Sequence, residues 1–480
     1  MLFNSFEFLI FLPIVFILYW FVFPKNRTAQ NVLLLVSSYF FYGWWDWRFL
    51  SLLFISSLCD YFLGQKIHNS TSRSGKRWGL GLSLLVNLGI LGFFKYYNFF
   101  VSSFIEAFAS VGIELQASTL QIILPVGISF YTFQTLSYSI DIYRGRLTPT
   151  KDVVSFFAFV SFFPQLVAGP IERASHLLPQ FQRDRNFSYR WGKDGLRQIL
   201  WGLFKKVVIA DNCAKVVDIA FADPANTHSS LLILGAVFFA LQIYGDFSGY
   251  SDIAIGTARL FGFHLMQNFR VPYLSRDIGE FWRRWHISLS TWFRDYVYIP
   301  LGGNRKGLTR HFINLGITFV ISGFWHGANW TFLAWGAVHA LYYVLFMFIY
   351  WLPIPKPKSP EGLGLRLIFR GLMTFVLVDL AWILFRADDI GQAKTYIQGI
   401  FANFGDSFLV LSQTQVQPIA TFCMWATVIM MLFEGANQTR RHSLILHRWP
   451  VWLRWPLYLV LMLAVLNFFG NEQAFIYFDF

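Results

Sequence analysis

The chain has 480 residues, of which 55% are hydrophobic and 20% are aromatic, whereas only 14% are charged. Soluble domains carry about 25% charged residues, so this composition excludes an ordinary soluble protein and indicates an integral membrane protein. The net charge of +13 is explained by basic loops beside membrane spans, and we therefore expect no nucleic-acid partner.

Apolar segments of membrane length recur from one end of the chain to the other. The first of them lacks the basic start and small-residue cleavage site of a signal peptide, so we expect it to be retained as a helix. The segments lie at roughly residues 7–23, 31–46, 49–65, 78–94, 98–113, 119–140, 153–168, 196–211, 230–262, 312–325, 330–352, 366–385, 417–434 and 452–470.

Glycine and proline break two of these segments, "ILPVGISFYTF" and "FFPQLVAGPIE". Such breaks are tolerated at membrane depth only where the backbone is packed in protein or lines a cavity, so we expect interrupted or re-entrant helices there. The sequence thus predicts an all-α polytopic membrane protein with about 11 crossings plus partial ones, built as one domain over residues 1–480.

The basic loops suggest an orientation in the membrane. The loops at 24–27 and 65–77 are both rich in Lys and Arg, and basic loops stay in the cytosol. Two helices lie between these loops, so the chain crosses the membrane twice and returns to the same side. If both loops are in the cytosol, the first helix, which precedes the loop at 24–27, must begin on the other side. We therefore expect an extracytoplasmic N-terminus, and leave the side of the C-terminus open.

Two carboxylates interrupt the long apolar segment "IYGDFSGYSDIAIGTARLFGF" at 243–263. Asp246 and Asp252 are six residues apart and do not share one helical face, which argues against a paired-carboxylate mechanism. They suit a proton pathway, ion pairs with the arginines of 276–294, or the orientation of a histidine. We favour the ion pairs.

The densest polar region follows, "SRDIGEFWRRWHISLSTWFRDYVYIPLGGNRKG" at 275–307. We predict one amphipathic helix here that ends near Pro300. Its basic face carries Arg283, His286, Ser290 and Arg294, which recur at helical spacing. Such a face fits an interfacial helix among lipid phosphates, or a cytosolic-side surface that receives an anionic acyl donor. Spacing does not decide between the two.

The segment "SGFWHGANW" at 322–330 places His326 inside an apolar stretch. Read as one helix, a polar stripe runs through Asn314, Thr318, Ser322, His326 and Asn329, and Gly323 and Gly327 form a GxxxG motif. From a start near His311, His326 would lie roughly 22 Å into a core of about 30 Å. A histidine at that depth is either hydrogen-bonded between helices or functional.

Taken together, these stretches resemble the membrane-bound O-acyltransferase (MBOAT) family, and in particular its bacterial branch of the alginate O-acetylation membrane-subunit type. The motifs that carry the resemblance are "FFPQLVAGPIER", "YGDFSGYSDIAIG", "NFRVPYLSRDIGEFWRRWHISLSTWFRDYVYIPLGGNR" and "SGFWHGANWTFLAWGAVHA". The likeness runs from the aromatic N-terminal helix to the closing "FIYFDF".

The resemblance implies a multi-helix bundle with re-entrant helices around a membrane tunnel or funnel. It also places His326 at the position of the family's catalytic histidine and His286 at the second motif position. We accordingly expect His326 to act as general base, and His286, with Arg283 and Arg294, to position the donor or stabilise the oxyanion. Asp295 is expected to orient an arginine, and the substrate-binding candidates are completed by Ser290, Asn329 and Asp246.

The implied function is transfer of an acyl group, acetyl by resemblance, from a cytosolic thioester such as acetyl-CoA towards an extracytoplasmic glycan. A periplasmic SGNH-hydrolase-like partner is implied as a possible receiver of the acetyl group, and a bacterial inner membrane as the location. No bound cofactor or metal is expected, because Cys59, Cys213 and Cys423 lack metal-ligand spacing. A transporter or flippase, and a noncatalytic scaffold for a periplasmic acetyltransferase, remain the alternatives.

Overall fold

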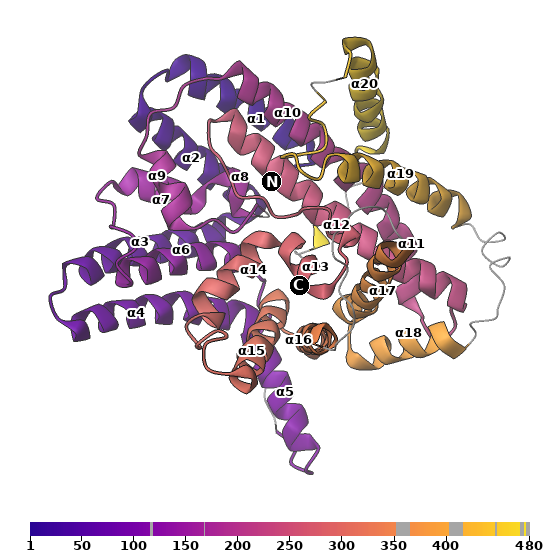
Figure 1. Ribbon diagram of the computed structural model, residues 1–480. Coiled ribbons are helices and arrows are strands. Elements are labelled where there is room, and N and C mark those ends of the chain that lie inside the picture. The colour runs from indigo at the N-terminus through magenta and orange to yellow at the C-terminus, as the bar shows by residue number, and fades with distance from the viewer. Residues whose placement is uncertain are drawn as a thin grey trace. The chain divides into compact units, whose positions relative to one another are not determined.

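The structure is a computed structural model that describes residues 1–115, 119–167, 169–351, 365–402, 416–446, 449–470 and 475–476. Every regular element within these ranges is helical, as Figure 1 shows. The expected all-α architecture is therefore confirmed for the described part of the chain.

Six helices in the described residues are long and apolar enough to cross a membrane. They comprise Arg73–Ala109, Ser229–Leu260, Trp330–Phe348, Leu365–Arg386, Gln417–Ala436 and Val451–Phe468. The chain is a multi-pass membrane protein. The expected number of about 11 crossings stays a prediction, since it includes shorter segments such as Phe6–Val22.

The chain divides into two compact units, and the expectation of a single domain stays a prediction. The first unit comprises Met1–Ile199 and Ile253–Met266, and the second Leu200–Asp252 and Gln267–Phe480. Helices α10 (Tyr189–Leu203) and α12 (Ser229–Leu260) each contribute residues to both units.

The first unit is made of short and long helices. Its other elements are α1 (Phe6–Ile17), η1 (Leu18–Val22), α2 (Arg27–Asp46), η2 (Trp47–Phe49), α3 (Leu50–Asn69), α4 (Arg73–Leu91), η3 (Gly92–Tyr96), α5 (Tyr97–Ala109), α6 (Ile128–Tyr143), α7 (Val153–Ser161), α8 (Phe163–Leu166) and α9 (Ala174–Phe181). Side chains cap several helix starts: Asn26 accepts from the Ala29 N–H, and Asp152 from the Ser155 N–H.

Both predicted interruptions are present in this unit. The "ILPVG" stretch is non-helical and α6 begins only at Ile128, after Gly127 in the left-handed conformation (φ 74°). The segment with "FFPQ" divides at Phe162 into α7 and α8. Pro164 lacks the N–H that a continuous helix needs, and it is accommodated in the first turn of α8, where that N–H has no partner within the helix, which explains the second break.

A buried carboxylate lies between α3, α4 and α6. Asp60 accepts hydrogen bonds from Ser83 (2.5 Å), Asn87 (2.7 Å) and Ser139 (3.0 Å). The Asn87 amide oxygen in turn accepts from Ser56 (2.8 Å). A buried carboxylate that accepts hydrogen bonds from two neighbouring helices fixes how the three helices are aligned. If one helix shifted along its axis, the carboxylate would lose its donors.

The second unit holds the elements that carry the long polar motifs. Besides its parts of α10 and α12, they are η4 (Phe204–Ala210), α11 (Asp211–Ala222), η5 (Pro272–Leu274), α13 (Ile278–Arg284), α14 (Ile287–Phe293), η6 (Arg294–Tyr298), α15 (Leu308–His326), α16 (Trp330–Trp351), α17 (Leu365–Arg386), α18 (Ile390–Ala402), α19 (Gln417–Ala436) and α20 (Val451–Phe468).

Helices α15 and α16 pack closely because glycines line their crossing (Figure 1). A Cβ placed on Gly323 would lie 2.2 Å from the Phe332 carbonyl oxygen, and one on Gly336 would lie 2.4 Å from the Phe319 oxygen. Only glycine permits this approach of two backbones. Both glycines of the predicted GxxxG motif lie against α16: Gly323 meets its backbone, and Gly327, just beyond the end of α15, meets the Phe332 ring, 2.0 Å from where a Cβ would lie.

Candidate active site

His286 occupies a strained turn in the second unit. Its backbone is left-handed (φ 40°, ψ 55°), a conformation that costs most residues other than glycine about 1–2 kcal/mol. The turn is held on its far side by Asn268, whose carbonyl oxygen accepts from the Ile287 N–H (2.9 Å) and whose amide oxygen accepts from Ser288 Oγ (2.6 Å). The side chain of His286 is consequently fixed in the protein interior, fully buried.

This turn overturns the prediction of one amphipathic helix over 275–300. The segment divides into α13 and α14 on either side of His286, followed by the π-helical turn η6. The Arg283 and Arg294 side chains are 68% and 57% exposed, whereas His286 is buried. The predicted common face therefore does not exist, because helical spacing cannot reveal a left-handed residue that reverses the chain.

His326 is the last residue of α15. The polar stripe Asn314–Thr318–Ser322–His326 runs along this helix as predicted, and His326 is 3% exposed. Asn329, however, lies after the helix end, where it donates to the Asp388 carbonyl oxygen (2.7 Å) and accepts from the Thr331 N–H (3.1 Å). The two backbone contacts assign Asn329 a capping position at α16 rather than a place in the stripe.

One aromatic side chain links the two histidines. The Trp325 ring centroid lies 5.0 Å from that of His326 and 6.2 Å from that of His286. On its other sides His326 contacts Trp335 (5.2 Å) and Phe385 (5.3 Å), both edge-on. The structure thus brings both candidate catalytic residues into one aromatic cluster.

The two carboxylates of α12 pair with lysines instead of the expected arginines. Lys206 contacts Asp246 (2.8 Å) and Asp211 (2.8 Å). Lys205 contacts Asp252 (2.6 Å) and Glu434 (3.3 Å). The predicted ion pairs of these carboxylates are therefore confirmed. The predicted partners, the arginines of 276–294, are wrong, because the lysines that form the pairs belong to η4, which lies outside that segment.

Asp246 has a second role in the packing of the site. Its Oδ2 atom accepts the Ile476 N–H (2.8 Å), and the neighbouring Phe475 ring packs on Tyr250 (4.3 Å between centroids). Phe247, one residue along, meets the His286 ring edge-on at 4.6 Å. Asp246, which was predicted to bind substrate, therefore holds in place residues that neighbour the Phe247 ring, and this ring packs against His286. Of the closing "FIYFDF", only these two residues lie in the described part.

Comparison with known proteins adds to this geometry. Residues 150–353 match the model of the membrane-bound O-acyltransferase family. The chain is 40% identical to a probable alginate O-acetylase of Pseudomonas putida, over 92% of this chain and 89% of that one. It is 41% identical to the Pseudomonas aeruginosa protein of the same name, over 91% and 82%.

A third relative, named peptidoglycan O-acetyltransferase, comes from Helicobacter pylori and is 37% identical over 86% of this chain and 82% of its own length. The chain belongs to the membrane-bound O-acyltransferase family. Its activity is O-acyl transfer, which requires an acyl donor, and the transporter and scaffold alternatives are not favoured.

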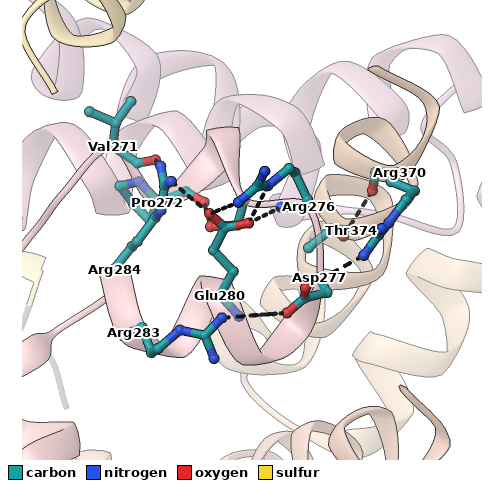
Figure 2. Close-up of polar contacts among 10 residues, drawn as sticks. Val271, Pro272, Arg276, Asp277, Glu280, Arg283, Arg284, Arg370 and Thr374 are labelled. Carbon is teal, nitrogen blue, oxygen red and sulfur yellow. Dashed lines mark hydrogen bonds and ion pairs between the residues drawn. The ribbon is translucent and has the colours of Figure 1, made fainter. Parts of the chain in front are cut away.

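In this O-acyltransferase, carboxylates hold a cluster of arginines around α13 (Figure 2). Asp277 caps the helix by accepting the Glu280 N–H (2.7 Å). Glu280 forms ion pairs with Arg276 (2.9 Å) and Arg284 (2.6 Å). Burial raises the pKa of Glu280, but the hydrogen bonds and charges of these two arginines outweigh burial and leave the pKa below its usual value.

Two further arginines reach Asp277, namely Arg283 (4.0 Å) and Arg370 of α17 (3.6 Å). Both distances leave most guanidinium N–H groups without a carboxylate contact from Asp277, and the Arg283 side chain is largely exposed. Guanidinium groups presented in this way suit oxyanions such as phosphate, because the planar fork can donate to two oxygens at once.

The remaining predicted residues lie on α14 and η6. Asp295 contacts Arg294, with 2.8 Å between Oδ1 and Nε. Ser290 donates to the Trp285 carbonyl oxygen (3.3 Å), which closes the turn around His286. Sequence reasoning missed the buried lysines Lys205 and Lys206, although the unusual pair in the apolar run "FKKVVIA" was a readable signal of buried carboxylate partners.

Proposed function

We propose that the chain moves an acetyl group from a cytosolic thioester, acetyl-CoA, to an extracytoplasmic glycan or to a partner protein that acetylates it. The relatives named alginate O-acetylase and peptidoglycan O-acetyltransferase support a glycan as final acceptor. Acetyl is the group that all three of these relatives carry in their names.

The observation that carries the proposal is the buried pair of motif histidines joined through Trp325. In the proposed reaction, His326 as neutral imidazole accepts the proton of the acceptor hydroxyl while the oxygen bonds to the thioester carbonyl carbon. The carbon–sulfur bond then breaks, and the proton passes from His326 to the departing thiolate. Imidazole suits both transfers, because its usual pKa lies near working pH.

The other predicted residues receive supporting roles in this proposal. His286 stabilises the carbonyl oxygen as negative charge develops, a contribution typical of preorganised donors in a dry site. Arg283 and Arg294 bind the donor phosphates, with Asp295 orienting Arg294. Ser290, Asn329 and Asp246 are assigned to positioning, since their side chains contact backbone groups of the site.

The location proposed is a bacterial inner membrane, with the N-terminus outside the cytosol and the whole chain acting as one domain around a tunnel or funnel. Donor and acceptor would then approach His326 from opposite sides. We further propose a periplasmic SGNH-hydrolase-like protein as the receiver of the acetyl group. The basic loops at 24–27 and 65–77 support this orientation.

The proposal is tested in proteoliposomes that hold radiolabelled acetyl-CoA inside, with a candidate glycan or an extract of extracytoplasmic proteins outside. We expect label to appear on an external glycan or protein, and unlabelled acetyl-CoA to compete. Movement of intact coenzyme without acetyl transfer would overturn the proposal in favour of transport. Equal transfer from acetyl-CoA placed outside would overturn the orientation alone.

A further inference from the structure

A third histidine lies beside the two motif histidines. His339 is fully buried on α16, and neither of its ring nitrogens has a hydrogen-bond partner in the protein. The proposed reaction gives it no role. A neutral imidazole needs one donor partner and one acceptor partner.

Two tryptophans in contact with His339 have the same property. Trp335 lies four residues before it on α16, with ring centroids 4.8 Å apart, and Trp282 of α13 reaches it at 4.9 Å. The indole N–H groups of both tryptophans are buried and have no hydrogen-bond partner in the protein. Four polar atoms from three touching side chains are therefore unsatisfied.

Four such atoms in one group of contacting side chains carry a substantial energetic cost. Each unsatisfied buried group costs about 1–3 kcal/mol. An N–H group that points at an aromatic face recovers a small part of this cost. It does nothing for the acceptor nitrogen of the imidazole.

The donor and acceptor pattern defines what would fit. The two indoles and the imidazole supply three N–H donors and one acceptor nitrogen. A hydroxyl matches this set, because its oxygen accepts from N–H groups while its proton is donated to the acceptor nitrogen. A carbonyl oxygen has no proton to donate, and an ammonium group would find a single acceptor.

We propose that His339, Trp282 and Trp335 form a second ligand-contacting subsite, which binds a hydroxyl group of the accepting molecule. Trp335 also contacts His326 at 5.2 Å, so the subsite adjoins the proposed base. The inference rests on the proposed function for the identity of the molecule. It rests on the contacts above for the existence of the subsite.

The first test needs no donor. Protein with ¹⁵N-indole tryptophan in nanodiscs is examined by NMR, and Trp282→Phe and Trp335→Phe spectra assign the two N–H signals. Water fills a polar subsite when no substrate is bound, so we expect both N–H groups to exchange magnetisation with water. Two N–H signals with no exchange would show a dry, structural cluster and overturn the inference.

The second test is kinetic, with acetyl-CoA as probe and the same acceptor extract. Trp282→Phe and His339→Phe keep a ring while removing polar atoms. Trp282→Phe, which removes one N–H donor, should lower kcat/KM about five- to tenfold, and His339→Phe, which removes two ring nitrogens, should lower it at least as much. Phe319→Leu is the control, because Phe319 packs on His339 with no polar atom. Equal effects of all three variants would overturn the inference. A wild type without acetyl transfer would contradict the proposed function instead, and the NMR test would still decide the subsite.

Discussion

Lys206 and Asp246 form an ion pair inside the second unit, with 2.8 Å between Nζ and Oδ1, and both side chains are almost fully buried. A charge removed from water is tolerated only while its partner remains. The pair therefore links η4 to α12, one residue before Phe247, whose ring packs against His286.

The first prediction concerns this pair. Lys206→Met should lower stability by about 3–5 kcal/mol, because two carboxylates, Asp246 and Asp211, lose their common partner. The triple variant Lys206→Met, Asp246→Asn, Asp211→Asn should recover much of the loss, since all three charges of this ion-pair group are removed together. Thermal unfolding in detergent measures both. Equal destabilisation of the single and triple variants would contradict the account.

The second prediction tests the helix crossing of α15 and α16. Gly323→Ala should destabilise the protein by about 1–3 kcal/mol, because its Cβ meets the Phe332 carbonyl oxygen. Gly316→Ala on the same helix is the matched control, since nothing lies within 4 Å of its Cβ. The control should be neutral or stabilising by up to about 1 kcal/mol. Similar melting temperatures for the two variants would argue against the crossing.

A third prediction separates the ring of His286 from its backbone. His286→Gly should melt at a higher temperature than His286→Ala, because glycine adopts φ 40° without the strain that alanine meets. Both variants should lose acyl transfer, since both lack the imidazole. An alanine variant as stable as the glycine variant would show that the left-handed turn is not retained.

The fourth prediction is a pH dependence in the first unit. The hydrogen bond between His176 Nδ1 and the Glu172 carboxylate (2.6 Å), which the carboxylate accepts from the protonated ring, raises the pKa of His176 above its usual 6.5. A raised folded-state pKa stabilises the fold below pH of about 6.5, and that stability is lost as pH rises through the folded pKa. Unfolding temperatures between pH 6 and pH 9 should fall in the wild type more than in His176→Gln. Parallel pH profiles would refute the contribution of the pair.

The helices could be predicted well from the sequence. Apolar length and Lys/Arg loops located most membrane helices to within a few residues, and the breaks before Ile128 and at Phe162 followed from glycine and proline. Short polar helices escaped, such as α9 and α18. Their stability comes from packing on neighbours, which a one-dimensional pattern does not record.

The candidate site could be predicted only in part. His286 and His326 stood out as polar residues in apolar surroundings, and the structure joins them through Trp325. The common face of 283–294 failed because one left-handed residue redirects the chain at His286. The partners of Asp246 were unpredictable from local spacing, since Lys206 lies 40 residues away in sequence and Ile476 lies 230 residues away.

The most direct measurement of the central claim is the rate of acetyl transfer by His326→Ala relative to wild type, under saturating acetyl-CoA and with folding checked by thermal unfolding. General base catalysis contributes about 10²- to 10⁴-fold, so we predict a kcat lower by that factor, with binding of the donor retained. A folded His326→Ala variant that transfers acetyl groups at the wild-type rate would contradict the account.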